Sequence, residues 1–397
     1  MEKIWSKLQT ERPVGTKENN VVSDFLGKQL QALGYEVKAL PFECKVWEKG
    51  PSKIEVSGKS IEIEPSPYSE GISISTQLVF ASNIEELKVA EVKNKVLVVS
   101  DEITKEALQP KDYPFYYPDE HKELITLFEE KAPAAIIAVT KQDFLSGMNP
   151  FPLFDDGNFL IPSAYIDEAR FEQINKLIGD GEDKITLVID SKTKMAESKQ
   201  VIATKKGKES SKKILCCAHM DTKYNTPGAL DNGVGVLMLM ELAKKLKDEE
   251  YTVQIVPFNG EEYYEASGEL CYLDEIKKEN SFPEFVVNLD SPCHKDGKNA
   301  VSFYNCDHFK ESAVSMMKDV SEVVEGEPWY AGDHSSFAFM GVPTIAVICS
   351  NLYEGGLADT HTPRDTAETI DIQLIPPTVE YIKQLISMAC INNYCRL

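Results

Sequence analysis

Residues 213–221 read KILCCAHMD, and this stretch decides the fold of the larger part of the chain. The uncharged apolar run at 214–218 predicts a strand that is buried on both faces, as in a parallel sheet. His219 follows the run directly, and Asp221 comes two residues later. Because side chains two positions apart on a strand point to the same face, we expect His219 and Asp221 to lie together at the end of this strand.

The chain from residue 198 onward repeats such apolar strands in alternation with helices. This alternation predicts an α/β fold with a mixed, mostly parallel central sheet flanked by helices. Further strands are expected at 251–259, 285–290, 300–305 and 342–349. Helices are expected at 16–34, 233–247, 308–323 and 371–392. The last helix is expected to break at Pro376 and Pro377, and the polar segment 197–213 is expected to be a hairpin or a linker.

In a parallel sheet, binding sites form at the carboxyl ends of the strands. Carboxylates that converge there repel one another unless cations neutralise them. Imidazole and carboxylate ligands together suit zinc or a neighbouring transition metal, and a pair of such ions forms a hydrolytic site. Two histidines and several carboxylates follow the predicted strand ends, namely His219, Asp231, Glu261, Glu262, Asp290 and His361.

The charge and composition of the chain exclude several classes of function. With 64 acidic and 42 basic residues, the formal net charge is −22, so nucleic acid and anionic membranes would be repelled. No apolar run reaches membrane-spanning length, and the N-terminus lacks the apolar core of a secretory signal. The nine cysteines are scattered without a CxxC pair. We therefore expect a reduced, cytoplasmic protein, whose oligomeric state the sequence leaves open.

Residues 43–197 differ from the rest of the chain. They contain short β-like runs, with helices expected near 119–131 and 168–178, and no cluster of ligand-type residues. This pattern predicts a smaller, β-rich α/β domain inserted into a larger domain. The larger domain would comprise residues 1–42 and 198–397.

The motifs of the larger domain resemble the zinc aminopeptidases of peptidase family M28. The order and spacing of the motifs make this resemblance specific, and the segment before residue 43 resembles the family's N-terminal helix and strand. The inserted module resembles the protease-associated domain that many members carry. The motifs are AHMD (218–221), GALDNGVG (228–235), FNGEEYY (258–264), NLD (288–290), GDHSSFAFMGVP (332–343) and HTPRDT (361–366).

The resemblance implies a zinc exopeptidase fold, of the phosphorylase/hydrolase-like type, with two zinc ions and a peptide or small amide as substrate. His219 and Asp290 would ligate one ion, and Glu262 and His361 the other. Asp231 would bridge the two ions.

The resemblance also implies roles for residues that are not metal ligands. Glu261 would be the general base, taking a proton from water and passing it to the leaving amine. Asp221 would orient His219, and Asp365 would support the loop of His361. The peptide bond between Asp231 and Asn232 would be cis.

The segment YYEASGEL (263–270) departs from the family pattern, and we expect the specificity of this protein to be set there. Glu265 and Glu269 are interpreted as solvated or structural, although one of them could hold a substrate ammonium group. Tyr330 and His334 are candidate substrate-binding residues. Tyr330 could polarise the substrate carbonyl, and His334 would support the site by hydrogen bonding.

Two alternatives stay open at this point. A carboxypeptidase or dipeptidase of the same fold would need a cation for the terminal carboxylate of its substrate. The chain has few arginines, but Arg364 lies close to His361 in the sequence. A metal-free, receptor-like binding protein is disfavoured, because every ligand and the base are present.

Overall fold

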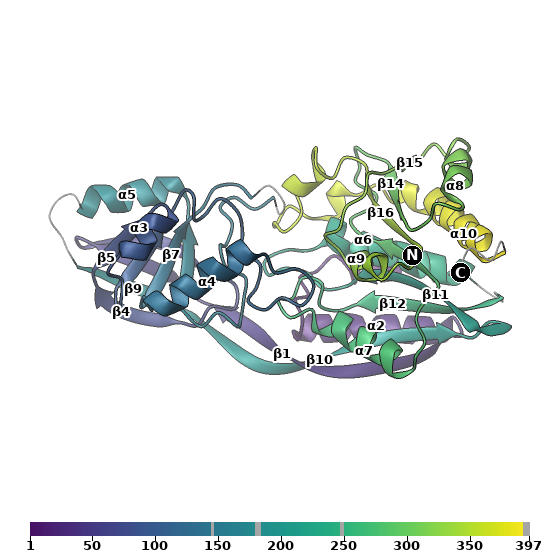
Figure 1. The fold of residues 1–397 in the computed structure, drawn as a ribbon, viewed down its shortest axis with the longest axis horizontal. Helices are drawn as coiled ribbons and strands as arrows, with labels where there is room; N and C mark the ends of the chain where they lie inside the picture. The colour runs from purple at the N-terminus through teal and green to yellow at the C-terminus, as the bar shows by residue number, and fades with distance from the viewer. Residues whose placement is uncertain (144–146, 179–183, 247–249, 392–397) are drawn as a thin grey trace. The chain divides into compact units, whose positions relative to one another are not determined.

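The computed structural model describes residues 1–143, 147–178, 184–246 and 250–391 (Figure 1). The chain divides into two compact units, the larger formed by Met1–Cys44 and Glu197–Leu397 and the smaller by Lys45–Ala196. The predicted insertion, 43–197, starts two residues before the smaller unit and ends one residue after it. Within the described ranges, no helix has both the length and the apolar character needed to cross a membrane.

Four parallel strands form the centre of the sheet in the larger unit, which confirms the predicted fold class. Their spatial order is β12 (Tyr251–Phe258), β11 (Glu209–His219), β13 (Phe285–Leu289) and β16 (Thr344–Cys349). β10 pairs with β12 and β14 pairs with β16, both antiparallel. The four flanking strands are β1 (Glu36–Lys49), β10 (Ser191–Lys205), β14 (Asn299–Tyr304) and β15 (Val323–Glu325).

Helices cover both faces of this sheet. Ile214 and Cys216 of β11 pack in one hydrophobic core, while Leu215 and Cys217 pack in another, as the alternation of a strand requires. The first core contains residues of α1 (Glu2–Trp5), α2 (Lys17–Ala32), α6 (Val234–Lys245), α8 (Lys310–Met317) and α10 (Ile375–Ile391). The second core contains residues of α7 (Ser267–Lys278) and α9 (His334–Phe339).

Three local predictions are wrong. The helix expected at 308–323 ends at Met317, because the chain turns there so that Val323 can pair with β14. Pro376 and Pro377 do not break the last helix. They lie in the first turn of α10, where the missing N–H of a proline costs no hydrogen bond. The segment 197–213 is not a hairpin, because β12 lies between β10 and β11 in the sheet.

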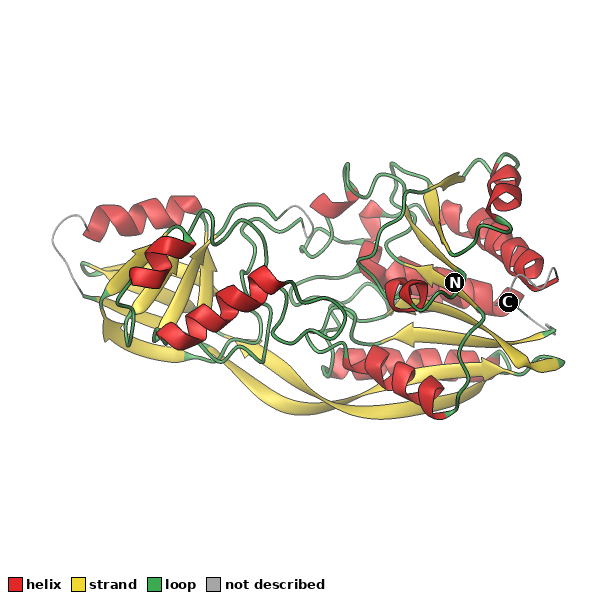
Figure 2. Cartoon of the chain, viewed as in Figure 1, coloured by secondary structure: helices red, strands yellow, loops and turns green. Residues whose placement is uncertain are grey.

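The smaller unit has its own sheet of eight strands. Four adjacent strands run parallel and four continue the sheet with antiparallel pairing. α5 (Glu168–Ile178) packs against one face, and α3 (Ile84–Val89) and α4 (Asp119–Lys131) pack against the other (Figure 2). The strands, in spatial order, are β4 (Ile72–Thr76), β9 (Ile185–Ile189), β2 (Ser52–Val56), β3 (Lys59–Pro65), β8 (Ser163–Ile166), β7 (Ala135–Val139), β6 (Val96–Val99) and β5 (Leu78–Ala81).

Arg12 ties the N-terminal segment to the loop that follows β11. Its side chain is completely buried, and burial lowers its pKa to about 10 although nearby carboxylates, Asp365 foremost, oppose the shift. The guanidinium group donates hydrogen bonds to five backbone carbonyl groups, those of Leu8, Thr10, Met220, Pro227 and Gly228. One side chain therefore fixes the loop that leads from β11 to α6.

We predict that Arg12→Met lowers the free energy of unfolding by about 3 kcal/mol, because buried carbonyl groups lose their donor. Urea unfolding followed by circular dichroism measures the change. Lys7→Met, which replaces an exposed cation in the same segment, is the control and is expected to change the stability by less than about 0.5 kcal/mol. Equal losses in the two variants would contradict the role given to Arg12.

Candidate metal centre

The carboxyl ends of the central strands gather the predicted ligands at one edge of the sheet. His219 is the last residue of β11, and Asp290 directly follows the last residue of β13. Glu262 follows β12 after a short turn, and His361 follows β16 after a longer loop. Asp231 lies in the turn that precedes α6, where its backbone is not helical, with φ of −116° and ψ of 92°. Because the four strands are parallel, these residues meet on the same side of the sheet.

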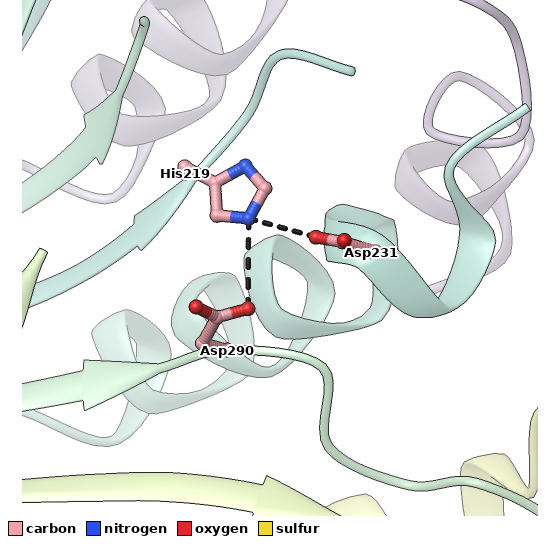
Figure 3. Close-up of side chains that lie close together, drawn as sticks. All are labelled: His219, Asp231 and Asp290. Carbon is pink, nitrogen blue, oxygen red and sulfur yellow. Dashed lines mark ion pairs between the residues drawn. The ribbon is translucent and has the colours of Figure 1, made fainter. Parts of the chain in front are cut away.

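His219, Asp231 and Asp290 form the first of two ligand groups (Figure 3). The Nε2 atom of His219 lies 2.9 Å from Asp231 Oδ1 and 3.5 Å from Asp290 Oδ1. All three residues are buried, and one ligand atom from each lies within 4.8 Å of the other two. A metal ion between these three residues would therefore meet one imidazole nitrogen and two carboxylate oxygens.

Asp231, Glu262 and His361 form the second group. The Nε2 atom of His361 lies 2.9 Å from Asp231 Oδ2 and 2.7 Å from Glu262 Oε1. Asp231 thus belongs to both groups and turns one carboxylate oxygen toward each histidine. The structure brings together all five predicted ligands, with Asp231 at the position where a bridging ligand is expected.

The electrostatics of the two groups suit cations. Burial opposes a charge on His219, but the carboxylates of Glu261, Asp231 and Asp290 outweigh burial and hold its pKa well above the usual value. The pKa of His361 is raised in the same way, against burial, by Glu262 and Asp231. Burial also works against the ionised form of Asp231, yet the two imidazoles hold its pKa far below the usual value.

In the metal-free protein, protons on the imidazoles therefore do what a metal ion would otherwise do. They neutralise carboxylates that burial has removed from water. A divalent cation that displaces such a proton meets a buried set of imidazole nitrogens and carboxylate oxygens, which is the set of donors that zinc takes. These residues therefore fit divalent transition-metal ions.

Asp221 fixes the turn that carries the two glutamates. Its carboxylate accepts hydrogen bonds from the backbone N–H groups of Gly260, Glu261 and Glu262, at 2.9, 3.3 and 3.1 Å. Its Oδ1 atom lies 3.9 Å from His219 Nδ1, which is too far for a hydrogen bond. Among the described residues, that Nδ1 atom has no hydrogen-bond partner. The hydrogen bonds of Asp221 thus position Glu261 and Glu262 rather than His219.

The turn that contains Asp231 is held from two sides. Asp365 accepts hydrogen bonds from the backbone N–H groups of Leu230 and Asp231, at 2.5 and 3.0 Å. Asn232 donates to the carbonyl group of Leu289, the last residue of β13, at 2.8 Å. The peptide bond between Asp231 and Asn232 is cis, as predicted. Asp365 thus holds the backbone of the turn that carries Asp231, and its predicted support of the His361 loop stays a prediction.

Lys223 contacts the predicted ligand Glu262, a contact that the sequence analysis did not predict. Its Nζ atom donates to the carbonyl oxygen of Glu262 at 3.0 Å and lies 3.5 Å from Glu262 Oε2. The other carboxylate oxygen, Oε1, faces His361. Lys223 therefore pairs with the outer carboxylate oxygen of Glu262, Oε2, while the inner oxygen, Oε1, faces the candidate metal site. No motif or spacing singles out a lysine two residues after Asp221.

A second set of buried acids lies close to Glu261. Glu269 and Asp333 are 3% and 1% exposed, so Glu269 is not a solvated residue. Ser336 donates a hydrogen bond to Glu269 Oε1 at 2.8 Å. Burial raises the pKa of Glu261 and of Asp333 well above the usual values, and neighbouring carboxylates add to both shifts. Burial, with the charge of Glu261, raises the pKa of Glu269 to about 8.

The two candidate substrate-binding residues lie in different surroundings. His334 is completely buried, and burial lowers its pKa to about 4. Its Nε2 atom lies 2.8 Å from the carbonyl oxygen of Trp329 and 3.2 Å from Tyr304 Oη. These contacts make His334 a neutral link between buried elements. Tyr330 is 52% exposed and stacks on Phe339, with ring centroids 5.2 Å apart. A contact of either residue with substrate stays a prediction.

The raised pKa of Glu269 predicts a pH dependence of stability. In the folded protein Glu269 keeps its proton up to a pH of about 8, whereas in the unfolded chain it loses the proton above its ordinary pKa of 4.5. Glu269 therefore lowers the free energy of unfolding as the pH rises from 4.5 to about 8. In metal-free protein, we expect Glu269→Gln to reduce the loss of stability between pH 5 and pH 8 by on the order of 2 kcal/mol. Urea unfolding at the two pH values measures this loss.

Glu279→Gln is the matched control, because Glu279 lies just beyond the other end of α7 with half of its side chain exposed. We expect this control to keep the pH dependence of the unchanged protein. A Glu269→Gln variant with the same pH dependence as the control would contradict the account of Glu269.

Comparisons with known proteins agree with this geometry. Leucine aminopeptidase 2 of Arthroderma otae is 25% identical over 240 residues, which are 56% of this chain and 42% of that protein. This chain thus spans less than half the length of that relative. An aminopeptidase structure from Aneurinibacillus sp. strain AM-1 is 20% identical, with a TM-score of 0.72 over 98% of this chain and 93% of the other.

The structure of BSAP, a zinc aminopeptidase from Bacillus subtilis, is 19% identical, with a TM-score of 0.71 over 98% of this chain and 94% of the other. At such identities the two structures show that the fold is shared. The family model described as "Peptidase family M28" matches residues 200–386, a range that includes all five predicted metal ligands. Residues 200–386 of this chain, which lie in the larger unit, are therefore similar to peptidase family M28.

Proposed function

We propose that this protein is a zinc-dependent aminopeptidase, a metallo-exopeptidase that removes N-terminal residues from peptides with two zinc ions. One observation carries this proposal, which is the sharing of Asp231 between two groups that each have their own histidine. A pair of metal ions bridged by a carboxylate needs this arrangement. The names of the similar proteins, which are leucine and zinc aminopeptidases, support the same activity.

Zinc ions bound in the two groups would lower the pKa of a water molecule and polarise the carbonyl group of the scissile bond. The protein's part is to hold these ions and to exclude competing charges. One ion would be held by His219 and Asp290 and the other by Glu262 and His361, with Asp231 between them.

Glu261 is the proposed general base. It belongs to neither ligand group, but it is adjacent to Glu262 on the turn that Asp221 fixes. Burial and the neighbouring acids raise its pKa, so its carboxylate accepts a proton readily. Glu261 would take the proton of the attacking water and pass it to the amine that leaves.

The contacts of Arg364 favour an aminopeptidase over a carboxypeptidase or dipeptidase. The Nε atom of Arg364 lies 3.5 Å from Asp359 Oδ1, and its guanidinium group also donates to the carbonyl oxygen of Ala358. This guanidinium group already has partners, so it is poorly suited to hold a substrate carboxylate. The acids around Glu261 suit the ammonium group of a free N-terminus instead. A metal-free receptor would not need the complete ligand set.

We also propose that residues 43–197 form an inserted domain similar to the protease-associated domain. The support for this proposal is that Lys45–Ala196 form a compact unit with a sheet and hydrophobic clusters of their own. Peptides and small amides are the proposed substrates, in a cytoplasmic protein.

The activity predicts a difference between free and blocked substrates. The zinc-loaded protein should release the chromophore from aminoacyl anilides, and N-acetylated twins of these anilides should react at least about 100-fold more slowly. Absorbance of the released amine measures both rates, and a chelator should abolish the faster one. Equal rates on the free and acetylated series would contradict the aminopeptidase assignment.

The general base predicts a loss of rate without a loss of metal. We expect Glu261→Gln to lower kcat by about 1,000-fold while the zinc content stays unchanged. Steady-state kinetics and elemental analysis measure the two quantities. Glu265→Gln is the control, since Glu265 is in the same segment and is half-buried like Glu261, and it should keep kcat within about two-fold. Full activity of Glu261→Gln would rule out this role.

A further inference from the structure

The smaller unit contains a hollow that is lined by residues of this unit. Its volume is about 620 Å³, which is in the range of small-molecule binding sites. It lies where β6 and β7, two adjacent parallel strands, end, and the first residues of α5 form another wall. In open α/β sheets, ligands bind outside the carboxyl ends of such strands.

The floor of this hollow is apolar and firmly held. Val139, the last residue of β7, and Phe151 line it and are 5% and 1% exposed. Thr104 donates a hydrogen bond to the carbonyl oxygen of Val139 at 2.7 Å, and Thr140 donates to that of Phe151 at 2.6 Å. The half-buried ring of Phe171 forms an apolar wall. The hollow is therefore preformed by packing and hydrogen bonds.

The rim of the hollow carries charges of both signs. Lys105 and Lys141 supply ammonium groups, while Asp101, Glu168 and Glu172 supply carboxylates. Lys141 Nζ lies 3.0 Å from Glu168 Oε1, and Lys105 Nζ lies 3.4 Å from Glu106 Oε1, in ion pairs that are exposed to water. Asp101 follows β6 and adopts a left-handed backbone conformation with φ of 53°, an unfavourable conformation for a residue with a side chain. This conformation places its carboxylate within hydrogen-bond reach of Ser100, whose hydroxyl group donates to Asp101 Oδ2 at 2.8 Å.

We propose that this hollow binds short peptides that have apolar side chains and two free termini. A zwitterion of this kind brings an ammonium group to Asp101 and Glu172 and a carboxylate to Lys105 and Lys141, while its side chains cover Val139, Phe151 and Phe171. The carboxylate of the ligand replaces Glu168 and Glu106 as the partner of the two lysines, because those ion pairs are exposed to water and contribute little. The proposal concerns the smaller unit alone and does not depend on the activity of the metal centre.

Binding of the dipeptide leucyl-phenylalanine to the full-length, metal-free protein tests this proposal. A chelator is present throughout, so that neither hydrolysis nor metal coordination contributes. Isothermal titration should give one site with a Kd of about 1 mM, since the rim charges are exposed to water. The N-acetylated and the C-amidated dipeptides should each bind at least about 10-fold more weakly.

Two variants test whether the dipeptide binds in the hollow. Asn175→Trp fills the hollow from an exposed position on α5, and Lys141→Glu reverses a charge on the rim. Each should weaken binding at least about 10-fold, whereas the control Lys122→Glu on α4 should leave the Kd unchanged. The absence of binding, equal binding of the blocked dipeptides, or unchanged binding by Asn175→Trp with an unaltered circular dichroism spectrum would each overturn the proposal.

Discussion

One carboxylate shared between two imidazoles is the constraint on which the site depends. Asp231 turns one oxygen to His219 and the other to His361, at the same distance of 2.9 Å. Neither histidine comes from the same element as Asp231. The carboxylate can reach both only if the turn before α6 is fixed relative to the end of β11 and to the loop after β16. Several otherwise unrelated features of the larger unit achieve this.

Arg12, Asp365 and Asn232 are these features. Arg12 fixes the loop that leads from β11 to the turn, Asp365 holds the backbone of the turn, and Asn232 ties it to the end of β13. All three are buried. Buried polar groups are costly unless they are paired, and here each is paired with the backbone of a segment that carries a ligand. The hydrogen bonds that stabilise these segments therefore also fix the geometry of the site.

The charges of the site explain why so many acids can be buried together. Burial raises the pKa of Glu261, Asp333 and Glu269, while the imidazoles keep Asp231 ionised. His361 likewise holds the pKa of Glu262 below its usual value against burial, whereas burial raises the pKa of Asp290 although this carboxylate lies 3.5 Å from His219 Nε2. Lys223 adds a positive charge at the outer oxygen of Glu262.

The sequence predicted the parts of this arrangement that follow from strand ends. His219 and Asp290 come directly after apolar runs, and Glu262 follows another after a short turn, so the sheet topology sufficed to bring them together. The burial of Glu269 could not be predicted, because it depends on how α7 packs beside Ser336 of α9. Nor could the start of α10 at Ile375 be predicted, since the prolines that follow can end one helix or lie in the first turn of another. Long-range contacts such as those of Arg12 and Lys223 leave no local pattern in the sequence.

Anomalous diffraction at the zinc absorption edge, from crystals of the zinc-loaded protein, tests the central claim most directly. Two peaks are expected, about 3.5–4 Å apart, one beside His219 and the other beside His361, with Asp231 in contact with both. A single peak, or two peaks of which only one contacts Asp231, would contradict the claim that this carboxylate is the shared ligand of a two-metal centre.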